Sequence, residues 1–157
     1  MRRPSPTALA TSAAVTATAL VGTAGTDVTS RWYRGLEKPP WQPPGPVFGI
    51  AWSGLYVLLA TAGARALAAA GPRERRSHGR AYAANLVLNA GWTRAFFRLR
   101  RPPIAAAEAV VLAASTADLA RRSARLDPTA GRLLLPYAAW TAFAAALSAE
   151  IARRNRG

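Results

Sequence analysis

The side chains of this sequence that could take part in chemistry are aromatic rings and amides rather than a set of catalytic acids and bases. The chain contains five Trp, one His and no Cys. A lone His without Cys cannot build a zinc site or a catalytic triad, and the sequence contains neither a phosphate-binding loop nor a nucleophile elbow. We therefore expect no metal site. The one histidine, His78, falls in the basic segment 73–80, which we predict to be a loop between helices.

Trp41 and Trp140 are the residues on which we base a ligand-binding hypothesis. Indole faces stack against flat aromatic molecules and contribute about 0.5–1.5 kcal/mol per ring pair beyond the burial of area. The alternative is that both anchor the chain at a membrane surface, where Trp is enriched. Trp52 and Trp92 are spaced to face the interior of a helical bundle, where they either line a pocket or pack against neighbours.

Polar residues within apolar segments form a second group of candidates. Asn85 and Asn89 lie four residues apart and therefore share one face of a helix. An amide in lipid needs a partner, so these side chains either bond neighbouring helices or contact a ligand. Tyr56 and Tyr137 leave the same two interpretations open. Glu108 is a functional candidate because charged groups are costly in a membrane, and its alternative is pairing with arginines at the end of the preceding helix, Arg94 or Arg98.

The distribution of charge indicates the elements that position these side chains. The chain has 157 residues, 51% of them hydrophobic, and a net charge of +14. Segments 4–26, 39–64 and 133–149 carry no charge, and a helix needs roughly 20 residues to cross a bilayer. The arginines gather in short clusters between apolar segments, which favours anionic lipid headgroups over nucleic acid as their partner. A soluble Ala-rich helical bundle is the alternative fold.

We predict an all-α integral membrane protein with five transmembrane helices in a single bundle formed by residues 1–157. The predicted helices cover residues 6–25, 46–69, 79–97, 103–122 and 129–153, and residues 26–45 form a structured aromatic loop, because their prolines stiffen it. Arg2 and Arg3 followed by an apolar run also resemble a signal peptide, so cleavage within residues 1–24 stays open; we favour an uncleaved helix.

Four motifs resemble those of the translocator protein / tryptophan-rich sensory protein family. They cover residues 31–44 (RWYRGLEKPPWQPP), 48–56 (FGIAWSGLY), 85–97 (NLVLNAGWTRAFF) and 135–144 (LPYAAWTAFA). Each motif alone is weak, but all four occur in the order and with the spacing of the family, so the resemblance covers nearly the whole chain.

The resemblance implies a five-helix membrane bundle, often a homodimer, with a pocket beneath the first loop. It implies ligands such as porphyrins, haem and sterols, and no required cofactor. The ligand-binding residues that we expect are Trp41, Pro43, Pro44, Phe48, Trp52, Tyr56, Asn89, Trp92, Glu108, Trp140, Ala144 and Leu147.

The sequence departs from the family pattern at several positions. Ser148 stands where the family usually has Asn, and Ile104 stands where animal members have a pocket Trp. No Tyr precedes the basic residues after Ile151, so a proposed cholesterol motif is missing. This absence weakens the hypothesis of a sterol-like ligand relative to a tetrapyrrole.

The leading functional hypothesis is a protein of the bacterial cell membrane that binds tetrapyrroles or related hydrophobic ligands as a sensor, transporter or scavenger. One alternative is a light-dependent porphyrin-degrading enzyme in which Trp41 and Trp140 take part, because an indole can donate an electron to a photoexcited porphyrin. The other is a structural or regulatory membrane protein that docks a partner through loop 26–45.

Overall fold

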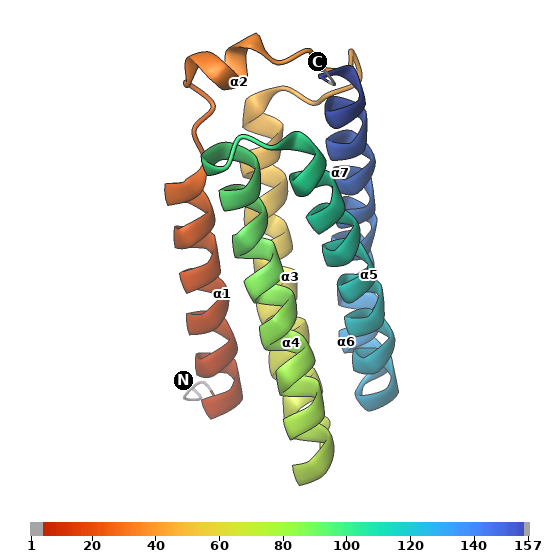
Figure 1. The fold of residues 1–157 in the computed structure, drawn as a ribbon. Coiled ribbons are helices and arrows are strands. Elements are labelled where there is room, and N and C mark those ends of the chain that lie inside the picture. The colour runs from red at the N-terminus through yellow and green to blue at the C-terminus, as the bar shows by residue number, and fades with distance from the viewer. Residues whose placement is uncertain (1–4, 156–157) are drawn as a thin grey trace.

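The structure is a bundle of helices. The computed structural model describes residues 5–155, and within that range every regular element is a helix. The elements are α1 (Pro6–Gly25), α2 (Arg31–Gly35), α3 (Gly45–Ala69), α4 (Pro72–Thr93), the π-helix η1 (Arg94–Arg98), α5 (Pro102–Leu126), α6 (Pro128–Leu133) and α7 (Leu135–Arg154). The long helices lie side by side, and α2 lies over one end of the bundle, the same end as the C-terminus (Figure 1). The all-α prediction is confirmed for these residues.

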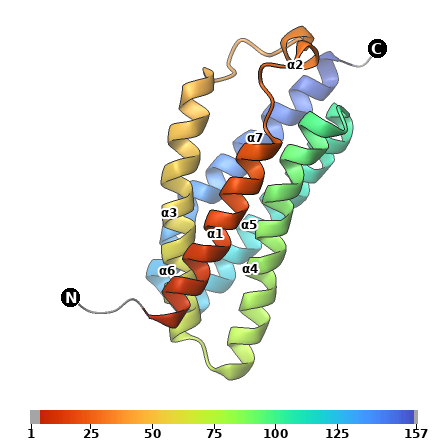
Figure 2. The same ribbon diagram turned by 90° about the vertical axis from the view of Figure 1, so that its left-hand side faces the viewer.

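Four segments are long and apolar enough to cross a membrane: Pro6–Gly25, Gly45–Ala69, Pro102–Leu126 and Pro128–Arg154. The prediction of a helical membrane protein therefore agrees with the structure, whereas the count of five spanning helices is not confirmed. The remaining long helix, α4, packs in the same bundle against α1 and α5 (Figure 2). Its first turns carry a cluster of arginines, which shortens its apolar length. Arg2 and Arg3, on which the signal-peptide interpretation depends, lie outside the described residues.

The segment that we predicted to be a basic loop is helical. α4 begins at Pro72 rather than near residue 79, because Pro is favourable in the first turn and the Glu74 side chain accepts a hydrogen bond from the Gly71 N–H at 3.1 Å. His78 is therefore a helical residue and is only 2% exposed. The predicted loop position for His78 was wrong, because the capping signals at Pro72 and Glu74 start the helix before the basic residues.

The predicted helix 129–153 is interrupted near its start. α6 ends at Leu133 and α7 begins at Leu135, with Pro136 in the first turn of α7. Pro lacks an N–H and its ring collides with the carbonyl four residues earlier, so it starts a helix more readily than it continues one. The preceding helix, α5, extends to Leu126, beyond the predicted residue 122.

Asp127 forms the corner between α5 and α6. Its side chain accepts a hydrogen bond from the Thr129 N–H at 2.8 Å and one from Arg65 Nε of α3 at 2.8 Å. Desolvation raises the pKa of Asp127, but the hydrogen bonds and the charge of Arg65 outweigh it and hold the pKa below its usual value. The carboxylate therefore stabilises this corner in its ionised form.

The core depends on small residues that allow helices to approach closely. Ala62 and Ala66 of α3 are fully buried, and a Cβ on Gly63 would lie 2.6 Å from Cε2 of Tyr82 on α4. Tyr82 Oη also donates a hydrogen bond to the Leu59 carbonyl at 3.0 Å. A glycine at position 63 is thus required by the position of the Tyr82 ring, as is common where membrane helices pack.

Candidate functional site

A series of aromatic rings joins loop 26–45 to the bundle. Trp41 of the loop contacts Phe143 of α7 with ring centroids 5.8 Å apart, and Phe143 contacts Trp140 at 5.4 Å. Trp140 in turn contacts Phe48 at 5.8 Å and Trp52 at 6.5 Å, both on α3. We call these five residues the aromatic ladder. Several of its contacts are edge-to-face, a favourable arrangement for aromatic pairs.

Helical spacing explains how the ladder forms. Phe48, Trp52 and Tyr56 follow one another at intervals of four, so they line one face of α3, and the rings of Trp52 and Tyr56 are 5.3 Å apart. Trp140 and Phe143 are three residues apart on α7 and face the same way. The sequence prediction therefore named four of the five ladder residues, and it missed Phe143 as a member although the residue lies within one of the motifs.

A buried polar network lies next to Tyr56. Tyr56 Oη donates to Asn89 Oδ1 at 3.0 Å, Asn89 Nδ2 donates to Tyr137 Oη at 2.9 Å, and Tyr137 Oη donates to Asn85 Oδ1 at 3.0 Å. Asn85 Nδ2 then donates to Thr116 Oγ1 at 2.9 Å. We call these five residues the polar network; they come from α3, α4, α5 and α7.

The network supports the interhelical interpretation of the asparagines. Asn85 and Tyr137 are fully buried, and Asn89 uses both its oxygen and its nitrogen within the network. Its part in ligand binding stays a prediction, and a ligand would have to share or displace these bonds. Thr116 was not predicted to be part of this network. A threonine within an apolar helix is nevertheless a signal for a hydrogen bond to a neighbouring helix.

Loop 26–45 is held against the bundle by a second aromatic cluster. Trp32 contacts Phe96 at 5.6 Å, and Tyr33 contacts Phe97 at 5.5 Å. Trp92 stacks on Phe96 with centroids 5.3 Å apart and an interplanar angle of 18°. Trp92 therefore packs in the cluster that supports the loop, and its predicted role as a pocket residue stays a prediction.

The C-terminal end of α7 also fixes the loop. Asn155 Oδ1 accepts a hydrogen bond from the Glu37 N–H at 3.0 Å, and Asn155 Nδ2 donates to the Glu37 carbonyl at 3.0 Å. Lys38 Nζ donates to the Tyr33 carbonyl at 2.6 Å and lies 4.6 Å from the centroid of the Tyr33 ring. The predicted structured loop thus contains the short helix α2 and is tied down at both its aromatic and its polar residues. No local pattern in the sequence signals the contact made by Asn155.

Glu108 lies on α5 against the backbone of α4. A Cβ on Gly91 would be 2.5 Å from Glu108 Oε1, so the carboxyl group occupies the space that the glycine leaves. Among the ion pairs of residues 5–155, none joins Glu108 to Arg94 or Arg98. The alternative that Glu108 pairs with these arginines was therefore wrong.

The remaining predicted residues lie near the ladder. Pro43 is half-buried and Pro44 is the N-cap residue of α3, so they set the path from Trp41 into that helix. Ala144 is half-buried, and Leu147 is buried with Phe96 and Phe97 in the cluster beneath the loop. The structure thus divides the predicted site between the ladder and the support of the loop.

Two buried polar atoms near the loop lack a hydrogen-bond partner among the described residues. They are Nε1 of Trp92, which is a donor, and Oε1 of Gln42, which is an acceptor. Gln42 is held through its other amide atom, since Nε2 donates to Tyr33 Oη at 3.3 Å. Within residues 5–155 no three His, Cys, Asp or Glu side chains cluster as metal ligands would.

Comparison with known proteins agrees with the four motifs. The sequence profile described as the TspO/MBR family matches residues 9–154. The chain is 36% identical over 124 residues to the tryptophan-rich sensory protein of Cereibacter sphaeroides, covering 79% of this chain and 77% of that protein. It is 35% identical over 134 residues to the translocator protein of Sus scrofa, covering 80% of this chain and 76% of that protein.

A third relative extends the match. The tryptophan-rich protein TspO of Chlorobaculum tepidum is 31% identical over 140 residues, covering 86% of this chain and 89% of that protein. The profile match includes the aromatic ladder and the polar network, and it covers all but residues 6–8 of the four apolar segments that are long enough to span a bilayer. The chain is therefore a membrane protein that belongs to the TspO/MBR family.

Proposed function

We propose that this protein binds a tetrapyrrole, such as a porphyrin or haem, or a related flat hydrophobic ligand between its helices, next to loop 26–45. The observation that carries the proposal is the aromatic ladder. Trp41 is 46% exposed although its ring contacts Phe143, so one indole remains available for stacking. Trp140 and Trp52 are half-buried and continue the series of rings into the bundle.

The polar atoms beneath the loop support the same proposal. Trp92 Nε1 and Gln42 Oε1 are a buried donor and a buried acceptor without protein partners, and an unpaired buried group costs about 1–3 kcal/mol. A porphyrin carries carboxylates that accept hydrogen bonds and ring N–H groups that donate them. A ligand of this chemistry would offer the groups that these two atoms lack.

The physiological role that we propose is sensing, transport or scavenging in the bacterial cell membrane. The location rests on the four apolar segments and on the bacterial relatives with matching sequences. The names of the relatives point to sensory and translocation roles for those proteins. A binding site formed by rings and amides fits all three roles, because none of them requires an acid–base group.

The proposal is tested by titrating protoporphyrin IX into the detergent-purified full chain in dim light while Trp fluorescence is recorded. We expect saturable quenching, with Kd about 2–10-fold weaker in Trp41→Phe and Trp140→Phe, since each loses part of an aromatic contact of about 0.5–1.5 kcal/mol. Trp32→Phe is the matched control, because Trp32 contacts Phe96 rather than the ladder. Linear, unsaturable quenching that is identical in all variants would instead indicate partition into the micelle, and docking of a partner by loop 26–45 would become the better hypothesis.

The same samples under illumination test the enzymatic alternative. The neighbouring indoles of Trp52 and Trp140, with ring centroids 6.5 Å apart, favour it, because they could share the radical left when one of them donates an electron to a photoexcited porphyrin. Dissolved oxygen would be the oxidant that accepts the electron from the reduced porphyrin and supplies the oxygen for its degradation. Loss of porphyrin absorbance in the light but not in the dark, reduced in Trp140→Phe, would support photochemical degradation. Equal loss with and without protein would exclude a role of the protein in this reaction.

A further inference from the structure

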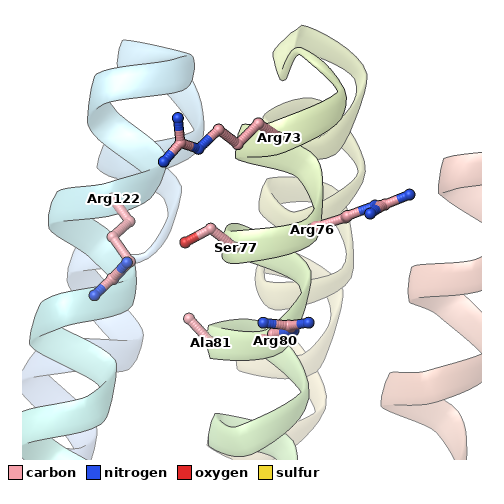
Figure 3. A pocket seen from close by; sticks show the side chains of 6 residues that line it. All are labelled: Arg73, Arg76, Ser77, Arg80, Ala81 and Arg122. Carbon is pink, nitrogen blue, oxygen red and sulfur yellow. The ribbon is translucent and has the colours of Figure 1, made fainter.

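A basic groove lies at the end of the bundle opposite loop 26–45. It is a cavity of about 640 Å³ between α4 and α5, lined by Arg73, Arg76, Ser77, Arg80, Ala81 and Arg122. We call it the arginine groove. Figure 3 shows Arg73 and Ser77 on α4 facing Arg122 on α5, whereas Arg76 points away from α5. Two guanidinium groups and one hydroxyl therefore face the same space, and the small side chain of Ala81 leaves room below them.

The charges of the groove are not balanced by the surrounding protein. Arg73, Arg76 and Arg80 have no ion pair among the described residues. The carboxylate of Glu74 forms no ion pair with them among the described residues, and its Oε2 accepts the hydrogen bond from the Gly71 N–H at the start of α4. Several like charges within two helical turns repel one another unless an anion lies between them.

Arg122 retains donors for a ligand although it has an acidic partner. Its Nε pairs with Asp118, and the same carboxylate also accepts a hydrogen bond from Arg121. A guanidinium has five N–H donors, so the two terminal nitrogens of Arg122 remain available. The carboxylate thus holds Arg122 in place at the groove, which its side chain lines.

We propose that the arginine groove binds a phosphate group, namely that of an anionic phospholipid headgroup. Arginine pairs with phosphate through two parallel hydrogen bonds, which suits a groove lined by guanidinium groups from two helices. The lipid source follows from position: Arg122 lies within the last two turns of the apolar segment Pro102–Leu126, where headgroups meet the protein. Basic pockets between helices at a membrane surface take such headgroups. This inference is independent of the tetrapyrrole proposal, which concerns the other end of the bundle.

Native mass spectrometry of the detergent-purified full chain tests the proposal. Retention of dioleoyl phosphatidylglycerol is compared with that of dioleoyl phosphatidylcholine, which has the same acyl chains and no net charge. Wild type should retain the anionic lipid selectively, and Arg73→Gln/Arg122→Gln should weaken its retention about thirtyfold, given about 1 kcal/mol for each of the two basic residues near a membrane surface. The matched control is Arg125→Gln/Arg132→Gln, which removes two exposed arginines at the same end without touching the groove.

Further variants keep the result decisive. Arg73→Lys/Arg122→Lys preserves the charge but loses the paired hydrogen bonds, so it should lose part of the selectivity, and it tests the groove if the glutamine variant does not fold. Equal losses in the groove variant and the control variant would overturn the proposal in favour of diffuse surface charge. Binding of inorganic phosphate is measured by calorimetry on the same variants. If phosphate binding depends on Arg73 and Arg122 while lipid retention does not, the lipid assignment is overturned in favour of a soluble phosphate ligand.

Discussion

Removing the hydroxyl of Tyr137 should destabilise the bundle more than removing any other single hydroxyl of the polar network. Tyr137 Oη accepts from Asn89 and donates to Asn85, and both bonds lie in the fully buried part of the core. Hydrogen bonds between membrane helices contribute about 0.6 kcal/mol on average and up to about 1.7. The loss of two bonds in Tyr137→Phe should therefore cost about 1–3 kcal/mol.

The matched variants remove the same atom at sites with one bond. Tyr56→Phe breaks only the bond to Asn89, and Tyr82→Phe breaks only the bond to the Leu59 carbonyl. Each should cost about half as much as Tyr137→Phe, since each loses one interhelical bond. Reversible unfolding by SDS in mixed micelles, followed by circular dichroism, measures the free energies. A cost for Tyr137→Phe no larger than that for Tyr56→Phe would refute the assignment of Tyr137 as the centre of the network.

Three further predictions concern the loop, the packing and the capping of the helices. Asn155→Ala removes both hydrogen bonds to the loop, so acrylamide should quench Trp fluorescence more strongly while the free energy of unfolding changes little. Gly63→Ala should lower the free energy of unfolding by about 1–3 kcal/mol, because the new methyl group collides with the Tyr82 ring. Gly54→Ala is the control, since its methyl group would meet no atom within 4 Å, and unfolding titrations compare the two variants. Asp127→Asn should lower the free energy of unfolding at neutral pH, where wild-type Asp127 is ionised. Because the pKa of Asp127 is depressed in the folded protein, the difference in unfolding free energy from wild type should shrink as the pH falls through that pKa. A difference that stays constant with pH would contradict this account.

The sequence was most informative where its signals are local. Pro6 and Gly25 bound α1 as predicted, because Pro at a helix start and Gly near its end are strong signals. The ladder residues of α3 could be placed on one face from their spacing of four. The start of α4 differs from the prediction, because the arginines of segment 73–80 are compatible with a helix and Pro72 and Glu74 form a capping pattern there.

The parts that could not be predicted depend on contacts between distant residues. Asn155 binds the backbone of Glu37 across 118 positions of the sequence, and no local pattern predicts such a contact. The division of the tryptophans between two clusters has the same cause: Trp92 and Trp52 have similar local environments in the sequence, and only the packing of η1 places Trp92 under the loop. Contacts between side chains of different helices depend on the tertiary arrangement and could not be predicted from local sequence patterns.

The most direct test of the proposed site is fluorine NMR of the full chain labelled with 5-fluorotryptophan, recorded during titration with protoporphyrin IX. The five Trp residues give five signals, and each is assigned by its Trp→Phe variant. The account predicts that ring currents of the bound porphyrin shift the signals of Trp41 and Trp140 most, with saturation, while that of Trp32 stays nearly unchanged. A largest shift at Trp32, or uniform broadening of all five signals without saturation, would contradict a tetrapyrrole site at the aromatic ladder.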